Sequence, residues 1–350
     1  MEVIKEEFGK LGEQTVFKFT LKNEKGLEFS CLNYGCVITK IMVPDRDGNV
    51  ENIVLGYDTL EEYIEDSYFL GAVIGRAAGR IKGGSFELDG KSYSLAQNEN
   101  TNHLHGGLKG FNRIVWDAEI LKNEQEIGVR FSYMSPDGEE GYPGNLKVAV
   151  TYSLNNQNEL TIRYDGKSDQ KTLLNMTNHS YFNLSGNLKR DVLQHTLKIK
   201  SDKYLPLTDE LLPTGEIAEV QGTPFDLTAN RFIHTGAASS HPQTILAGKG
   251  YDHPFLLSAR HDQEIVLTDE ESGRTLTIET DEAGVVVYSG NQLKEAGEIF
   301  GAPCRKYLGI CLETQGHPNA VHHPQFPSWI LDKDEEYKTA TVYKFGTGEN

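Results

Sequence analysis

The 350-residue chain carries 51 acidic and 34 basic residues, which gives a formal net charge of −17. A charge of this sign repels phosphate backbones and anionic lipid surfaces, so nucleic acid and membranes are excluded as expected partners and a neutral ligand is favoured. Hydrophobic residues make up 38% of the chain and charged residues 24%. This balance is typical of a globular protein with a buried core.

The start of the chain, Met1 to Lys10, contains no continuous apolar run, and no apolar stretch of transmembrane length follows it. The four cysteines match no zinc-site spacing, and a chain of this length needs no disulfide for stability; they are Cys31, Cys36, Cys304 and Cys311. We therefore expect reduced thiols and a cytoplasmic protein.

In chain order, the first turn signal is Asp47-Gly48-Asn49. Residues 59–65 (TLEEYIE) form the one segment with helical periodicity, and Asp58 is its expected N-cap. Asp89-Gly90 then separates SFEL from KSYSL, which predicts a β-hairpin. The first third of the chain therefore combines strands with a single short helix.

Further along, apolar residues alternate with polar ones in segments 127–133, 146–154, 160–164 and 276–278. The turn NNQN at 155–158 separates two of these segments. Short amphipathic strands with turns between them predict an all-β protein with few short helices, folded as a large antiparallel β-sandwich. No linker or repeat interrupts the pattern, so we expect one domain over residues 1–350.

Five segments rich in glycine, histidine, asparagine and proline stand apart from the alternating strands, and we expect them to be loops that carry binding chemistry. They are GRAAGRI (75–81), NHLHGG (102–107), TNHSYFNLSG (177–186), GYDHPF (250–255) and CLETQGHPNAVHHPQFP (311–327). The arginines of the first segment, Arg76 and Arg80, fit sugar binding but fit neutralisation of an acidic surface equally well.

The histidines and one glutamate of these segments admit two interpretations each. In an extended HLH string only one of His103 and His105 faces a given side, and no acid or cysteine stands at metal-ligand spacing, so no metal is expected. His179 lies among hydroxyls, amides and aromatic rings, which suits a polyol or a buried structural histidine. Glu313 ends the apolar run 307–312, where desolvation would raise its pKa and make it a better base.

In this order and spacing the five segments resemble those of the aldose 1-epimerase (galactose mutarotase) family. The similarity extends to NYGCVITKIMVPDRDG and NIVLGYDTLEEY near the start and so covers nearly the whole chain. The resemblance implies the galactose mutarotase-like supersandwich and the interconversion of the α and β anomers of free hexoses, such as galactose and glucose, without a cofactor. A small-molecule sugar is the implied partner, and the oligomeric state stays open.

The resemblance also implies roles for single residues. Glu313 corresponds to the general base, His179 to the general acid and His105 to a further active-site histidine. We expect ionised Glu313 to take the proton of the C1 hydroxyl while protonated His179 gives one to the ring oxygen. Residues that correspond to sugar-binding positions are Arg80, Gly79, Tyr181 and Asp252.

Two departures from the family pattern leave the preferred hexose open. Gly79 stands where some relatives carry asparagine, and Val286 stands where some carry glutamine. Neither position holds the acid or the base.

Three alternatives remain. A glycoside hydrolase would use Asp252 and Glu313 as a carboxylate pair. A hexose-phosphate epimerase on the same fold would need basic residues beyond Arg76 and Arg80 in its pocket. A non-catalytic sugar-binding protein would need neither an acid nor a base.

Overall fold

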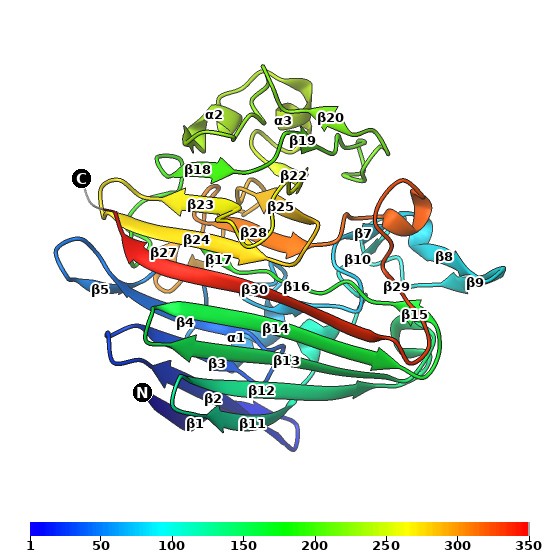
Figure 1. Ribbon diagram of the computed structural model, residues 1–350, viewed down its shortest axis with the longest axis horizontal. Helices are drawn as coiled ribbons and strands as arrows, with labels where there is room; N and C mark the ends of the chain where they lie inside the picture. Colours follow the sequence, from blue (N-terminus) through cyan, green and yellow to red (C-terminus); the bar gives the residue numbers. More distant parts are fainter. Residues whose placement is uncertain (349–350) are drawn as a thin grey trace.

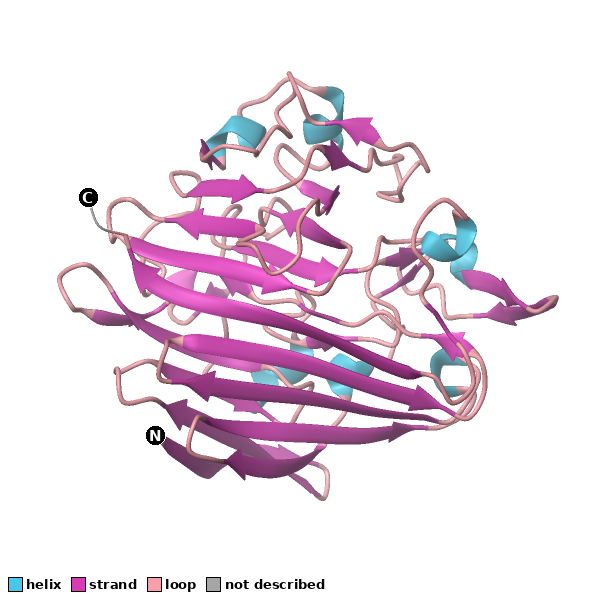
Figure 2. Cartoon of the chain, viewed as in Figure 1, coloured by secondary structure: helices cyan, strands magenta, loops and turns pink. Residues whose placement is uncertain are grey.

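The computed structural model describes residues 1–348, and antiparallel sheets dominate it (Figures 1 and 2). The first sheet has the order β1 (Glu2–Leu11), β2 (Gln14–Lys22), β3 (Glu28–Leu32), β4 (Ile38–Pro44) and β5 (Val50–Asn52). The largest sheet has nine strands in the order β11 (Asp117–Lys122), β12 (Glu126–Ser135), β13 (Leu146–Asn155), β14 (Glu159–Ser168), β30 (Glu336–Thr347), β24 (Arg274–Thr280), β23 (Ile265–Thr268), β18 (Thr196–Ile199) and β21 (Arg231–Phe232).

A third sheet has six strands in the order β17 (Tyr181–Phe182), β28 (Ile310–Gln315), β25 (Gly284–Tyr288), β22 (Asp252–Leu256), β19 (Lys203–Tyr204) and β20 (Ala218–Glu219). The strand pairings inside these three sheets are antiparallel, as predicted. Short two-stranded pairs complete the structure: β10 (His103–Leu104) with β7 (Arg80–Ile81), β15 (Thr172–Leu173) with β29 (Ile330–Leu331), β16 (Thr177–Asn178) with β6 (Val73–Ile74), β26 (Glu298–Ile299) with β27 (Ala302–Pro303), and β8 (Ser85–Leu88) with β9 (Lys91–Ser94).

The helices are short. They are α1 (Leu60–Glu65), α2 (His234–Ala237) and α3 (Pro242–Leu246), with single 3-10 turns at 82–84, 111–113, 139–141 and 320–322. Of these, α2 and α3 lie at the top of the view (Figure 2). The sequence predicted α1 but placed its cap one residue too early. Thr59, not Asp58, caps the helix, because the hydroxyl of Thr59 accepts from the N–H of Glu62 while the Glu62 carboxylate accepts from the Thr59 N–H.

The predicted turns hold the positions that the sequence assigned to them. Asp89 and Gly90 connect β8 to β9 with φ values of 50° and 76°, the left-handed conformation that a tight hairpin turn requires. Residues 155–158 connect β13 to β14, and residues 47–49 lie between β4 and β5. Turn chemistry therefore fixes the strand order locally.

One cluster of buried apolar side chains joins all three large sheets. It takes Phe29 from the first sheet, Ile162 from the nine-stranded sheet and Leu312 from the six-stranded sheet. Thr314 on β28 and Thr341 on β30 also share a hydrogen bond, with their hydroxyl oxygens 2.7 Å apart. Because each sheet buries its apolar face against another, the predicted all-β sandwich is confirmed.

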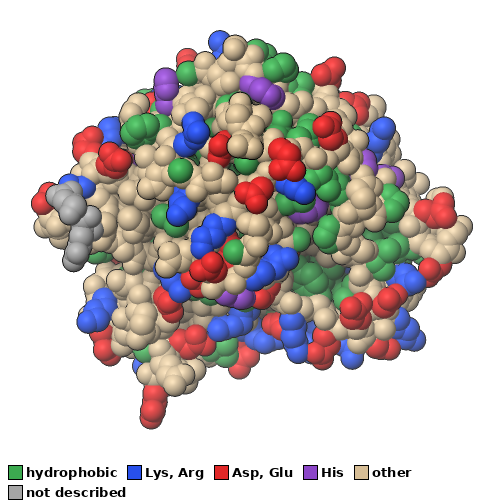
Figure 3. Space-filling model, turned by 45° about the horizontal axis from the view of Figure 1, so that its top comes forward, with side chains coloured by type: hydrophobic (Ala, Val, Ile, Leu, Met, Phe, Trp, Pro, Cys, Tyr) green, Lys and Arg blue, Asp and Glu red, His purple; other side chains and the backbone are tan. Residues whose placement is uncertain are grey.

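Two further predictions concern the whole chain. All four cysteines are free, as predicted, and all four are buried. Within residues 1–348, none of the helices combines the length and the apolar character that crossing a bilayer requires. On the face drawn in Figure 3, acidic and basic side chains are intermingled, so the net negative charge is not gathered there into one acidic patch.

Candidate active site

Three neighbouring strands of the six-stranded sheet divide their side chains between the core and a cavity of about 290 Å³. Successive residues of a strand point to opposite faces, so one face of β22, β25 and β28 can pack while the other binds. Val285, Val287 and Leu312 join the core cluster. The side chains that line the cavity from these strands are Asp252, Pro254, Val286, Tyr288, Glu313 and Gln315.

The strand register decides which of these groups meet. Glu313 pairs with Val286, and Cys311 pairs with Tyr288. Asp252 also pairs with Tyr288 from the other side, and Tyr181 pairs with Cys311. Glu313 lies inside β28 and not at its end, and Asp252 begins β22, so the expectation that the chemistry lies in loops is wrong for these two carboxylates.

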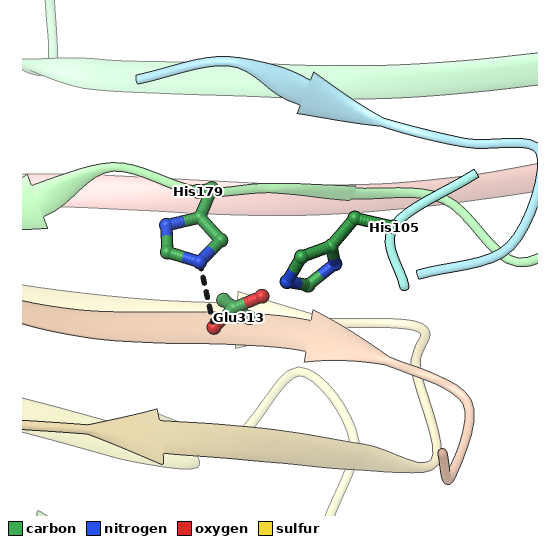
Figure 4. A group of neighbouring side chains, drawn as sticks. All are labelled: His105, His179 and Glu313. Carbon is green, nitrogen blue, oxygen red and sulfur yellow. Dashed lines mark ion pairs between the residues drawn. The ribbon is translucent and has the colours of Figure 1, made fainter. Parts of the chain in front are cut away.

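The two histidines approach Glu313 from the other wall of the cavity (Figure 4). His179 directly follows β16, and His105 directly follows β10. The Nε2 atom of His179 lies 3.7 Å from Oε1 of Glu313. One ring nitrogen of each histidine and one carboxylate oxygen of Glu313 all lie within 4.8 Å of one another. The predicted acid, base and further histidine therefore share one cavity.

Gly79 fixes the tautomer of His105. The backbone N–H of Gly79 donates to the ring atom Nδ1 of His105 over 3.2 Å. The backbone N–H of His105 donates in turn to the Gly79 carbonyl over 3.0 Å. A ring nitrogen that accepts a hydrogen bond carries no proton, so neutral His105 holds its proton on Nε2. A metal-ligating histidine normally donates from its second nitrogen instead. This polarity favours His105 as a hydrogen-bond donor and disfavours metal binding through Nε2.

Burial acts in opposite directions on the acid and the base. It raises the pKa of Glu313 well above its ordinary value; nearby Asp252 adds to this rise and Arg80 opposes it. Burial lowers the pKa of His179 to about 4 and that of His105 well below its ordinary value. Without a ligand, one proton shared by Glu313 and His179 therefore lies preferentially on Glu313, which makes both groups neutral. The sequence analysis expected an ionised Glu313 and a protonated His179 instead.

Two carboxylates in the cavity accept no hydrogen bond from residues 1–348. Glu313 is only 3% exposed, and its pKa responds to burial and charge but to no hydrogen bond. Burial raises the pKa of Asp252 to about 6, with Arg80 opposing the rise. Both groups thus keep free acceptor positions where a polyol can place hydroxyl groups.

Arg80 is held by a residue that the sequence analysis did not single out. Its Nε and Nη2 donate to the two carboxylate oxygens of Glu99 over 2.5 and 2.7 Å. Glu99 lies in the polar string Asn98-Glu99-Asn100, which carries no recognisable motif. Only the fold reveals that Glu99 lines the cavity.

Gln315 is a second residue that was missed, although its position gives a signal. It lies two residues after Glu313 on β28, so both side chains share one face of the strand. Its side chain is 1% exposed, and its Oε1 is buried without a partner in the described part of the chain. Its Nε2 donates to the Gly316 carbonyl over 3.3 Å.

Aromatic rings form the apolar side of the cavity around the histidines. The ring of Tyr181 lies 5.1 Å from that of His179, measured between centroids, and its hydroxyl donates to the Tyr68 carbonyl over 3.0 Å. The Phe69 ring lies 4.9 Å from His105 and 5.8 Å from His179. The hydroxyl of Tyr181 is therefore engaged within the protein, and its ring is the part that can contact a bound molecule.

Two residues of the same sequence segments lie outside the cavity. Arg76 is 2% exposed, and its guanidinium donates to Ser135 and to the carbonyls of Pro143 and Gly144, among other acceptors. His103 bonds the Ala96 carbonyl through Nδ1 and the Tyr142 hydroxyl through Nε2. Both are structural, and His103 faces away from His105 as an extended string predicts.

Comparison with known proteins identifies the family. The family model described as aldose 1-epimerase matches residues 18–344. The chain belongs to the aldose 1-epimerase family. Among curated members of this family, it is 44% identical to the galactose mutarotase of Bos taurus over 340 residues, covering 96% of this chain and 95% of that protein. It is 32% identical to the maltose epimerase of Levilactobacillus brevis over 346 residues, covering 99% of both.

A solved structure agrees with this membership of the aldose 1-epimerase family. The galactose 1-epimerase of Lactobacillus acidophilus superposes with a TM-score of 0.89 at 30% identity, and the match covers 99% of each chain. The family and its fold, both expected from the sequence motifs, are therefore confirmed.

Proposed function

We propose that this aldose 1-epimerase family member interconverts the α and β anomers of a free hexose in the cavity, with Glu313 as general base and His179 as general acid. One observation carries the proposal: Oε1 of Glu313 and Nε2 of His179 lie 3.7 Å apart within one cavity. The relatives named galactose mutarotase support a hexose such as galactose as substrate.

The reaction moves two protons and breaks one bond. The Glu313 carboxylate removes the proton of the C1 hydroxyl, and the electron pair of that O–H bond forms the aldehyde C=O. The C1–O5 bond breaks, and O5 takes a proton from Nε2 of His179. After rotation about the C1–C2 bond, the aldehyde presents its other face. As O5 attacks C1 and the ring closes, His179 takes the proton back from O5 and Glu313 gives its proton to O1.

The proton count of the pair stays at one throughout. Glu313 and His179 begin as carboxylate and imidazolium and become carboxyl and neutral imidazole in the open-chain state. Burial raises the pKa of Glu313 and lowers that of His179, so the dry cavity favours the neutral pair. The ring-opened state is therefore matched by the favoured protonation of the pair, whereas the carboxylate and imidazolium that start ring opening are the less stable form of the empty cavity.

The other lining residues hold the sugar while C1 rotates. Asp252 and Gln315 offer acceptors for hydroxyl groups, and the free N–H groups of Arg80 offer donors. Nε2–H of His105 donates to a sugar oxygen near the reacting carbon. The rings of Tyr181 and Phe69 cover the apolar face of the pyranose, a common contact in carbohydrate sites.

The charged groups of the cavity favour a neutral sugar over the hexose-phosphate alternative. The basic lining side chains are Arg80 and Lys294, and Arg80 is already paired with Glu99. Arg76, the second arginine considered from sequence, is buried elsewhere. A non-catalytic sugar-binding protein would in turn gain nothing from burying a carboxylate against an imidazole.

Polarimetry of freshly dissolved α-galactose and α-glucose tests the proposal. Glu313→Gln should lower kcat by about 100-fold or more with a smaller change in KM, because it removes a proton transfer that acts in the transition state. Glu282→Gln is the matched control: burial also raises the pKa of Glu282, but Glu282 does not line the cavity. Near-wild-type turnover in the Glu313 variant would rule out its role as base.

We also propose the cytoplasm as the compartment of this enzyme. Four free, buried thiols persist in a reducing environment, and the acid–base mechanism needs no partner from another compartment. Cell fractionation followed by immunodetection tests the proposal, and recovery in a secreted fraction would overturn it.

A further inference from the structure

The proposed reaction gives no task to two charged groups of the cavity, the exposed Lys294 and the partly buried Glu99. The charged side chains that line the cavity are Arg80, Glu99, Asp252, Lys294 and Glu313. Glu313 takes the proton, and Asp252 and Arg80 bind hydroxyls in the proposed function. Glu99 neither transfers a proton nor presents a free carboxylate, because both of its oxygens are used by Arg80.

The ion pair between Arg80 and Glu99 has the geometry of a ligand-binding fork that is already occupied. Two parallel N–H groups of Arg80 bind the two carboxylate oxygens, the arrangement by which arginine recognises carboxylates and phosphates. The side chains are 14% and 28% exposed, so the pair is only partly open to solvent. Three N–H groups of Arg80 remain, which suffices for hydroxyls.

The backbone holds Glu99 in place before any ligand arrives. Glu99 and Asn102 exchange two backbone hydrogen bonds of 3.1 and 2.9 Å. Arg80 is fixed from the other side, because β7 pairs with β10 and sets Arg80 opposite Leu104. Backbone hydrogen bonds therefore hold the chain segments that carry both members of the ion pair.

We propose that Glu99 is a specificity-determining residue that restricts this enzyme to uncharged aldoses by occupying the anion-binding fork of Arg80. A sugar with a carboxylate would have to displace Glu99 from the fork, or lie near Asp252 and Glu313 with only the remaining Arg80 N–H groups and the exposed Lys294 as partners. Each choice leaves a negative charge of the cavity poorly compensated, which is costly. The proposal rests on the proposed function, since it presupposes that sugars bind in this cavity.

The experiment compares two sugars that differ in charge but hardly in shape. D-galacturonate is an anion at neutral pH, and D-galacturonamide is its neutral counterpart. The ratio of their kcat/KM values for anomer exchange, measured by NMR at constant ionic strength, reports the penalty on charge alone. In the wild type this ratio should lie well below one.

Glu99→Gln should raise the ratio by about tenfold or more, because it removes one negative charge next to the ligand and frees the Arg80 fork. Glu99→Ala serves as a second variant should the first fold poorly. Glu210→Gln is the matched control: Glu210 contacts Thr101 and Asn102 of the same loop, is exposed and does not line the cavity. It should leave the ratio unchanged.

Two results would overturn the proposal. If Glu99→Gln lowers kcat/KM for both sugars by the same factor, Glu99 only orients Arg80. If Glu210→Gln shifts the ratio as strongly, the penalty comes from the overall field of the protein. Failure of the proposed function itself gives a different result, because the wild type would then not accelerate galactose mutarotation at all.

Discussion

Asp252 combines a functional position with an energetic cost. Its carboxylate lines the cavity, accepts no hydrogen bond from residues 1–348, and has its pKa raised from 3.8 to about 6 by burial. Because the folded-state pKa lies above the unfolded value, the folded state loses stability as the pH rises from about 4 through about 6. Near neutral pH the protein therefore carries a desolvated charge whose purpose, in the proposed function, is to accept sugar hydroxyls.

Asp252→Asn should consequently stabilise the protein at high pH while weakening sugar binding. We expect the free energy of unfolding to exceed that of the wild type by about 2–3 kcal/mol near pH 8 and to equal it near pH 4. Urea unfolding of both proteins at the two pH values measures the difference. A difference that does not depend on pH would show that the Asp252 carboxyl titrates normally.

Gln315 allows a second prediction, in which a substitution weakens substrate binding without lowering the stability of the fold. Its Oε1 is a buried acceptor without a partner in the described residues, and such a group costs folding free energy. Gln315→Met keeps the shape and removes the acceptor. We expect KM for galactose to rise about 3- to 10-fold, as the loss of one neutral hydrogen bond implies, while thermal stability stays equal or increases. A fall in stability with unchanged KM would identify Gln315 as a purely structural residue.

Among the elements, β28 shows how one strand serves folding and chemistry with alternate side chains. Ile310 and Leu312 enter the shared core, whereas Glu313 and Gln315 line the cavity. The two roles should therefore be separable by mutation.

Leu312→Ala tests this separation. Leu312 is 1% exposed, so the substitution should lower the free energy of unfolding by about 2–5 kcal/mol. The kcat per folded molecule should stay close to that of the wild type, because the cavity face of β28 is untouched. Urea unfolding and polarimetry on the same preparations provide both values, and Glu313→Gln should show the reverse profile.

The same elements show what the sequence could and could not predict. Long strands such as β13 and β14 can be predicted from the alternation of apolar and polar residues, and Asp89-Gly90 predicts its hairpin. Both signals are local in the sequence. The partners of β28 could not be inferred, since its neighbours β17 and β25 lie more than 20 residues away along the chain and pair with it only in the fold. Two-residue strands such as β7 and β10 are too short for any periodicity.

The site could be predicted from the sequence where a residue's type and its surrounding motif indicate its chemical role. Glu313, His179 and His105 were found through motifs, and the structure brings them together. Glu99 lies in an ordinary polar string, and its closeness to Arg80 arises from the pairing of distant backbone segments. The neutral state favoured for the Glu313–His179 pair was also beyond sequence reasoning, because it depends on how completely both groups are buried.

At the scale of the whole molecule, the three large sheets share one apolar cluster that runs from Phe19 to Phe345. The cluster gives no sheet a separate core, so we predict that the chain unfolds as a single cooperative domain. Differential scanning calorimetry should show one transition whose calorimetric and van 't Hoff enthalpies agree. Two resolved transitions would divide the chain into independent units and contradict the single domain expected from the sequence.

The alternation on β28 has a consequence for how such a protein can change. Inserting or deleting one residue ahead of Glu313 would turn the carboxylate towards the hydrocarbon interior and send Leu312 to the solvent side. Packing and catalysis would fail together, and no single compensating substitution could restore both. Length variation within β28 is therefore not tolerable, and this strand can change the sugar preference of the enzyme only by substitution.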